Sequence, residues 1–286
     1  MRSEKEMMDL VIDFAKAEDR VRVVGMNGSR TNTNVKKDHF QDYDIVYIVT
    51  EMDSLLQNRE WLDYFGERMI MQTPEESSLS PATLGNWFTF LMQFTDGNRI
   101  DLMLIPLEEL DSYMQNDSLT RIVVDKDNLI ATPPIPDESS HYVKRPTAQQ
   151  FTDSCNEFWW VSPYIAKGLC RGEFLYATNH LDRVLREELL RMIAWNVGAE
   201  YYFKVNLGAA YKFLHHYMDA NMLESLQETY QLNSMDKCWN GLFLMQKLFQ
   251  QQAKKLADRL EFNYPDHFEK VIPYIQKLHQ EFHQGS

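Results

Sequence analysis

The sequence is poor in cysteine and lacks both a membrane-spanning run and a signal-peptide pattern. Its three cysteines, Cys155, Cys170 and Cys238, are an odd number without a Cys-x-x-Cys spacing. They are therefore expected to be reduced core thiols rather than a disulfide framework. No run of about 18 apolar residues is present, which argues against a transmembrane helix. Residues 1–15 carry several acids instead of a basic start, so we expect no signal peptide and a cytoplasmic protein without a membrane partner.

Basic residues are also scarce, because 29 Lys and Arg face 42 Asp and Glu, giving a formal net charge of −13. A nucleic-acid ligand needs a basic surface to neutralise its phosphates, so we expect no nucleic-acid partner. A polycationic small molecule suits the acidity better. Taken alone, the net negative charge is explained at least as well by a simpler alternative, in which it only keeps the protein soluble.

Several catalytic motifs are missing. The sequence has no Gly-x-Gly-x-x-Gly, P-loop, His-Glu-x-x-His or Gly-x-Ser-x-Gly, which removes several competing enzyme classes. The eight histidines show no metal-ligand spacing. The chemistry must therefore be sought in other residue types.

The informative stretch is a polar segment between two predicted strands at residues 21–24 and 45–49. Asp42 and Asp44 stand directly before the second strand, and side chains two residues apart share one face of a strand. Two carboxylates that close repel each other, so a cation is expected between them. The alternative is a solvated strand entry with no ligand.

The other half of this segment is suited to phosphate. A glycine at Gly28 lets the backbone approach a phosphate closely, and Ser29 adds a hydroxyl at an expected helix start. Magnesium binds through one or two carboxylates and completes its shell with water and phosphate oxygens. Asp101, at the start of a third apolar strand, is a candidate third ligand of a two-metal site. Its alternative is a solvent-facing acid on an edge strand.

Gly-Ser, then Asp-x-Asp, then a later strand Asp resembles the nucleotidyltransferase superfamily that includes DNA polymerase beta. Longer blocks along the whole chain narrow the resemblance to the aminoglycoside 6-adenylyltransferases. These blocks are residues 1–8, Gly28-Ser29-Arg30, Phe40-Gln41-Asp42-Tyr43-Asp44-Ile45, Arg99-Ile100-Asp101-Leu102, Cys155-Asn156-Glu157-Phe158-Trp159, Lys167-Gly168-Leu169-Cys170-Arg171 and Leu190-Arg191-Met192.

The resemblance implies Mg²⁺-dependent transfer of AMP from ATP to an aminoglycoside hydroxyl, with the 6-hydroxyl of streptomycin as first choice, which would confer resistance to the drug. Asp42, Asp44 and Asp101 are then the catalytic and metal-binding residues. The triphosphate would be bound by the Gly28-Ser29 turn, with Arg30 either contacting phosphate or only capping the turn. Lys212, with Lys167 and Lys204, is a candidate to neutralise the leaving pyrophosphate, although each is also an ordinary surface lysine. We expect a monomer.

Two positions depart from the pattern of that family. The family tends to have Asp-His where this chain has Asn179-His180, and an asparagine cannot accept the proton of the acceptor hydroxyl. It also tends to have Gly-Lys where this chain has Gly208-Ala209. Candidate replacement bases are Asp182, Glu173 and Glu157. A catalytically weakened homologue that only binds nucleotide or drug, and transfer to another small-molecule or protein hydroxyl, both stay open.

Four acids are candidates to receive the cationic groups of an aminoglycoside, namely Glu75, Glu76, Asp153 and Glu157. Trp159 and Trp160 are candidates to stack on such a cation. The alternatives are plain surface acids and core aromatic side chains.

The order of elements predicts an α+β protein in two parts. A nucleotidyltransferase domain over residues 1–132 is expected to carry a mostly five-stranded mixed sheet, with strands at 21–26, 43–50, 68–72, 87–94, 99–105 and 121–125. A proline-rich linker over 133–146 follows, because prolines stop regular structure. Residues 147–286 are predicted to be a helical substrate-binding domain, with the substrate in the cleft between the domains. Its helices are expected at 147–169, 174–197, 209–218, 222–230, 234–260 and 265–282.

Overall fold

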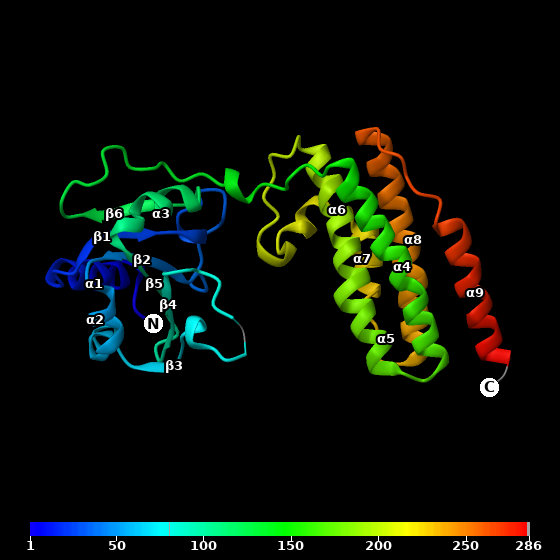
Figure 1. The fold of residues 1–286 in the computed structure, drawn as a ribbon, viewed down its shortest axis with the longest axis horizontal. Coiled ribbons are helices and arrows are strands. Elements are labelled where there is room, and N and C mark those ends of the chain that lie inside the picture. The colour runs from blue at the N-terminus through cyan, green and yellow to red at the C-terminus, as the bar shows by residue number, and fades with distance from the viewer. Residues whose placement is uncertain (80, 285–286) are drawn as a thin grey trace. The chain divides into compact units, whose positions relative to one another are not determined.

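The computed structural model describes residues 1–79 and 81–284 and divides the chain into two compact units. The first unit is Met1–Ser140 and the second begins at His141. The first is built on a β-sheet and the second on helices (Figure 1). The α+β class and the order of its two parts are as predicted. No helix in the described ranges is long and apolar enough to span a membrane.

A six-stranded sheet forms the centre of the first unit. Its strands lie in the order β3-β4-β5-β2-β1-β6. β2 and β5 pair in parallel, whereas the other four neighbouring pairs are antiparallel. The bounds are β1 Val21–Met26, β2 Tyr43–Val49, β3 Arg68–Gln72, β4 Phe88–Phe94, β5 Arg99–Pro106 and β6 Arg121–Asp125. The expected count of five strands is wrong, because the last strand joins the sheet at the edge beside β1.

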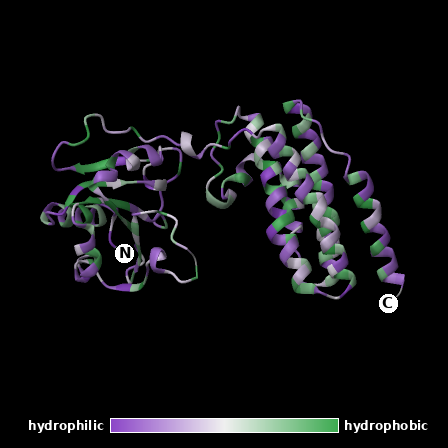
Figure 2. Ribbon diagram, in the orientation of Figure 1, coloured by the Kyte–Doolittle hydropathy of each residue, from purple (hydrophilic) through white to green (hydrophobic). Residues whose placement is uncertain are grey.

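Helix α1 (Glu4–Ala17) covers one face of this sheet. Ser3 caps it in a reciprocal capping box with Glu6. Its buried side chains Met7 and Val11 pack in one cluster with the odd-numbered residues of β2 from Tyr43 to Val49. Because side chains alternate along a strand, the even-numbered residues of β2 face the opposite side. Figure 2 shows the apolar character of these strands.

The opposite face of the sheet is covered by α3 (Leu110–Asn116). Val46 and Ile48 of β2 pack there with Ile105 of β5 and Tyr113 of α3. Two further short helical segments, α2 (Met52–Gln57) and a 3₁₀ segment (Glu60–Phe65), follow β2 in the chain. The α3 face is the one that receives Asp44, because Asp44 shares its parity with Val46 and Ile48.

The second unit is a helical bundle around one core. Phe158 and Phe249 stack at its centre with their rings 3.8 Å apart, against the buried Trp159. The cysteines are free thiols, with Cys155 and Cys238 buried. The helices are α4 Ala148–Cys170, α5 Phe174–His180, α6 Arg186–Glu200, α7 Ala220–Glu228, α8 Met235–Leu260 and α9 Phe268–Gln284, and a π-helical segment, Leu181–Leu185, joins α5 to α6.

The predicted helix at 209–218 is wrong. The chain forms two short 3₁₀ turns there, Ala209–Tyr211 and Leu214–Tyr217. Gly208, Ala210 and Tyr211 have positive φ angles of 71°, 51° and 60°. An α-helix requires negative φ at every position, so these residues break it despite its apolar spacing.

Candidate active site

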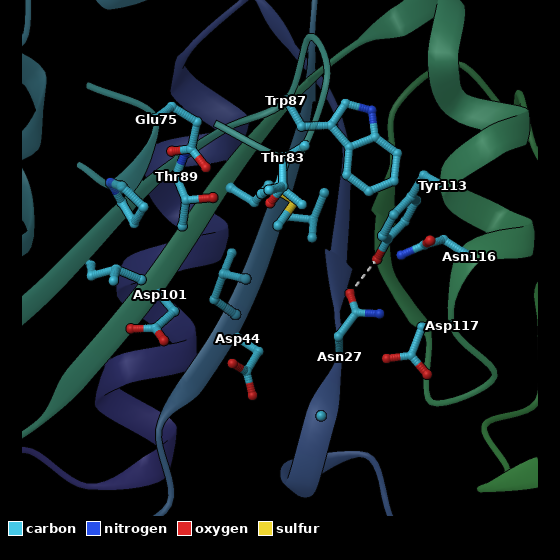
Figure 3. Close-up of a pocket in the computed structure, with 17 residues that line it drawn as sticks. Asn27, Asp44, Glu75, Thr83, Trp87, Thr89, Asp101, Tyr113, Asn116 and Asp117 are labelled. Carbon is cyan, nitrogen blue, oxygen red and sulfur yellow. Dashed lines mark hydrogen bonds between the residues drawn. The ribbon is translucent and has the colours of Figure 1, made fainter. Parts of the chain in front are cut away.

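The parallel pairing of β2 and β5 brings two of the predicted acids together. Asp44 is the register partner of Asp101 across this pair. Figure 3 shows both carboxylates on the same side of the two adjacent strands. β5 lies between β4 and β2 inside the sheet, so the edge-strand alternative for Asp101 is wrong.

The glycine turn lies directly against Asp44. Gly28 has φ of +70°, and a Cβ built on it would lie 2.2 Å from Asp44 Oδ2. The backbone N–H of Asn27 donates to the carbonyl oxygen of Asp44 at 2.9 Å. Any larger residue would have to displace the Asp44 carboxylate and adopt a φ that favours glycine. The expected helix start at Ser29 is a three-residue 3₁₀ turn, Gly28–Arg30.

Asp44 is a buried acid whose pKa is strongly raised. Burial, followed by the charges of Asp101 and Asp42, raises the pKa of Asp44 to about 6, and Arg99 acts in the opposite direction. A buried carboxyl beside other acids gains from a bound cation, because the cation favours its charged form. The side chains of Asp42 and Asp101 are 40% and 20% exposed.

Arg99 lies among these acids. Its Nε lies 2.7 Å from Asp101 Oδ1 and its Nη2 lies 2.8 Å from Asp101 Oδ2. Its Nη1 lies 3.6 Å from Asp42 Oδ2. The sequence reasoning did not single out Arg99, although its place two residues before Asp101 was a usable signal.

The donor chemistry suits magnesium, since carboxylate oxygens are the hard ligands that it prefers and Gly28 leaves an open backbone beside them. Within the described ranges, however, no three His, Cys, Asp or Glu side chains are gathered in a way that could hold a metal. Both Asp101 oxygens accept hydrogen bonds from Arg99 instead. Asp42, Asp44 and Asp101 are the residues that would hold the ion.

A cavity of about 490 Å³ opens on the α3 side of Asp44 and Asp101. Besides these acids, its lining includes Asn27, Trp87 and Tyr113 (Figure 3). The Tyr113 hydroxyl donates to Asn27 Oδ1 at 2.8 Å, and the Asn27 amide donates to Thr120 Oγ1 at 2.7 Å. This volume is within the usual range of small-molecule sites.

Three of these lining residues were missed by sequence reasoning. Asn27 was detectable, because it precedes Gly28 in the glycine turn. Trp87, directly before β4, and Tyr113 of α3 reach the cavity through the tertiary fold, and no local pattern marks them. The indole N–H of Trp87 donates to Glu109 Oε2 at 2.5 Å, which fixes the ring in the cavity wall.

Arg30 has a structural position. Its buried guanidinium donates to the carbonyl oxygens of Gln41 at 2.7 Å and Asp42 at 3.0 Å. It also lies 3.7 Å from the ring centre of Tyr43. Of the two predicted roles, these contacts favour holding the turn, which places Asp42, over contacting phosphate.

The remaining candidate residues of the second unit differ in the contacts that their side chains make. Lys212 follows the first 3₁₀ turn, and its Nζ lies 5.1 Å from the ring centre of Phe213. Asn179 lies in α5. Asp182 Oδ1 accepts from Arg186 Nε at 2.6 Å. Because this bond occupies Asp182, Glu157 and Glu173 are the better candidates for a replacement base.

Of the acids considered for a cationic ligand, Glu76 is paired with Arg59 at 2.6 Å. Glu75 lines the cavity beside Asp44 and accepts from the Thr89 N–H at 2.9 Å. Asp153, Glu157 and the exposed Trp160 line a second cavity on the helical unit. Trp159 is 1% exposed and packs in the core, as its alternative predicted.

A mixed sheet with a glycine turn against one of two facing acids, followed by a helical unit, defines this protein as a nucleotidyltransferase. The comparisons with known proteins agree. The family model described as streptomycin adenylyltransferase matches residues 1–278. The chain belongs to the streptomycin adenylyltransferase family.

Its relatives are similar over nearly their whole length. The aminoglycoside 6-adenylyltransferase of Bacillus subtilis (strain 168) is 43% identical, over 98% of this chain and 99% of the relative. The aminoglycoside 6-adenylyltransferase of Campylobacter jejuni is 44% identical, over 96% and 95%. The crystal structure of an aminoglycoside 6-adenyltransferase from Bacillus subtilis matches with 39% identity and a TM-score of 0.49, covering 98% of this chain and 99% of that one.

Proposed function

We propose that this enzyme transfers AMP from ATP to a hydroxyl group of an aminoglycoside, with the 6-hydroxyl of streptomycin as the acceptor to test first. The observation that carries the proposal is the facing pair Asp44 and Asp101 beside Gly28. The family and the names of the relatives support both the adenylyl donor and the acceptor class.

Each part of the site has a proposed task. The Gly28-Ser29 turn binds the triphosphate, since a glycine backbone admits a phosphate at close range. Asp42, Asp44 and Asp101 hold Mg²⁺, which when bound supplies charge neutralisation on the phosphates and a lower pKa for the attacking hydroxyl. Arg30 keeps Asp42 in place through the Asp42 carbonyl oxygen. Lys212 is the proposed cation for the leaving pyrophosphate.

The acceptor is proposed on charge. An aminoglycoside carries several ammonium or guanidinium groups, and carboxylates bind these through charge-assisted hydrogen bonds. Of the four candidate acids, Glu75 lines the first cavity, and Asp153 and Glu157 line the second. Trp160, which is 68% exposed, offers an aromatic face to a cation in the second cavity.

The test is pyrophosphate release from ATP, with and without streptomycin, by the wild-type protein and by Asp44→Asn. We expect release that depends on streptomycin and Mg²⁺ in the wild type and a loss of at least about a thousandfold in the variant. The control is Asp111→Asn, which removes an exposed acid of α3. Near-normal turnover by Asp44→Asn rejects the site, and turnover with other acceptors but not streptomycin rejects only the acceptor.

A second candidate, binding without turnover, is favoured by Asn179 in place of an acid and by the engagement of Asp182 with Arg186. Calorimetry with streptomycin separates it from the enzyme. Heat of binding together with no pyrophosphate release supports this reading, whereas release excludes it.

A further inference from the structure

One guanidinium joins two of the three predicted metal ligands. Arg99 and Asp101 are two residues apart on β5, so their side chains leave the strand on the same face. The guanidinium makes a two-point ion pair with Asp101, at 2.7 and 2.8 Å. Its third nitrogen lies 3.6 Å from Asp42 Oδ2. Arg99 thus lies where the acids of β5 and of the segment before β2 converge.

The charges around Arg99 explain why it lies there. Asp42, Asp44 and Asp101, hereafter the acid cluster, carry like charges, and Arg99 supplies an opposite charge within ion-pair distance of Asp42 and Asp101. A guanidinium is always charged in proteins, so Arg99 remains a cation beside these acids. The acid cluster therefore already has a cation without any metal.

We propose that Arg99 is the resting counterion of the acid cluster and competes with the divalent metal for Asp101. This rests on the proposed metal-dependent function. Both Asp101 oxygens accept hydrogen bonds from Arg99, and a divalent cation at those oxygens repels the guanidinium. Metal binding therefore requires the Arg99 side chain to turn away. With 37% of its side chain exposed, Arg99 has solvent into which it can turn.

The competition also accounts for the arrangement of the acids. The register places Asp44 and Asp101 side by side, yet no three-ligand group is gathered in the part of the chain that the structure describes. A two-point ion pair fixes both the position and the plane of a carboxylate. Arg99 is thus a positioning residue, which fixes the orientation of the Asp101 carboxylate.

The test is binding of Mn²⁺ alone to the full-length protein, followed by electron paramagnetic resonance. We expect Arg99→Met to bind Mn²⁺ about tenfold more tightly than the wild type, because the competing charge is gone. Arg99→Lys keeps the charge but loses the planar fork, so its affinity should fall between the two. Without metal, Arg99→Met should melt at a lower temperature than the wild type, and Mg²⁺ should restore more of its stability.

Arg171→Met is the matched control, because it removes one charge from an arginine whose side chain is 65% exposed. It should bind Mn²⁺ like the wild type. Equal or weaker Mn²⁺ binding by folded Arg99→Met overturns the proposal, since Arg99 would then assist the metal. Asp44→Asn tests the metal site separately from the competition by Arg99. Unchanged Mn²⁺ affinity in that variant rejects the metal site itself.

Discussion

Gly28 and Asp44 lie so close that a Cβ on the glycine would stand 2.2 Å from Asp44 Oδ2. The glycine follows β1 and the aspartate is on β2, which are antiparallel neighbours in the sheet. The turn proposed for phosphate and an acid proposed for metal therefore share one contact. A substitution at either residue should therefore alter the positions of both the turn and the carboxylate.

Gly28→Ala should reduce kcat/KM by at least about a hundredfold, because the new methyl group must displace the Asp44 carboxylate. The positive φ of +70° adds backbone strain of about 1 kcal/mol. Steady-state kinetics and urea unfolding measure the two effects separately. Gly172→Ala is the control, because Gly172 has a similar φ of +73° with open space around it. It should lose a similar stability and keep its activity; equal activity in both variants would contradict the contact.

Tyr113→Phe should lower both the stability of the protein and its kcat. The Tyr113 hydroxyl donates to Asn27 Oδ1, and Tyr113 is 2% exposed, so loss of the hydroxyl leaves the partly buried Asn27 acceptor without that donor. We expect a loss of about 1–2 kcal/mol in the free energy of unfolding. Asn27 directly precedes Gly28 in the turn proposed to bind the triphosphate. A shift of Asn27 should therefore lower kcat by more than the loss of stability alone explains. Tyr64→Phe, on an exposed ring, is the control, and identical kinetics for both variants would refute the link.

Asp96→Asn should remove a pH-dependent part of stability. Burial by itself would raise the pKa of Asp96, but hydrogen bonds from Arg2 and Asn98 outweigh it and hold the pKa well below its ordinary value. Arg2 Nε lies 2.8 Å from Asp96 Oδ2 and fixes the chain start to the β4–β5 turn. A carboxyl with a lowered folded-state pKa stabilises the protein above its unfolded value of 3.8 and loses this contribution as the pH falls further.

The variant should therefore be about 1 kcal/mol less stable than the wild type at pH 7. The difference should shrink as the pH falls through 3.8 and below. Urea unfolding at a series of pH values measures it, with Asp111→Asn as the control for an exposed acid. A difference between Asp96→Asn and wild type that does not change with pH would show that the ion pair is not its source.

Local patterns predicted much of the first unit correctly. Alternating apolar residues identified its strands within a residue or two. They did not give the number of strands in the sheet, since strand pairing is a contact between distant segments. They also failed at 209–218, where positive φ angles ended a helix that the apolar spacing indicated.

The sequence by itself determined the residues available for chemistry: Gly28, Asp42, Asp44 and Asp101 in the spacing of a nucleotidyltransferase, together with membership of its family. Only the tertiary structure decided which of them face each other. The parallel pairing of β2 with β5 sets Asp44 opposite Asp101, and alternation along both strands turns them toward the α3 cavity. The contact of Arg99 with Asp101 and Asp42 was decided there too, because an ion pair depends on distances that chain spacing alone does not fix.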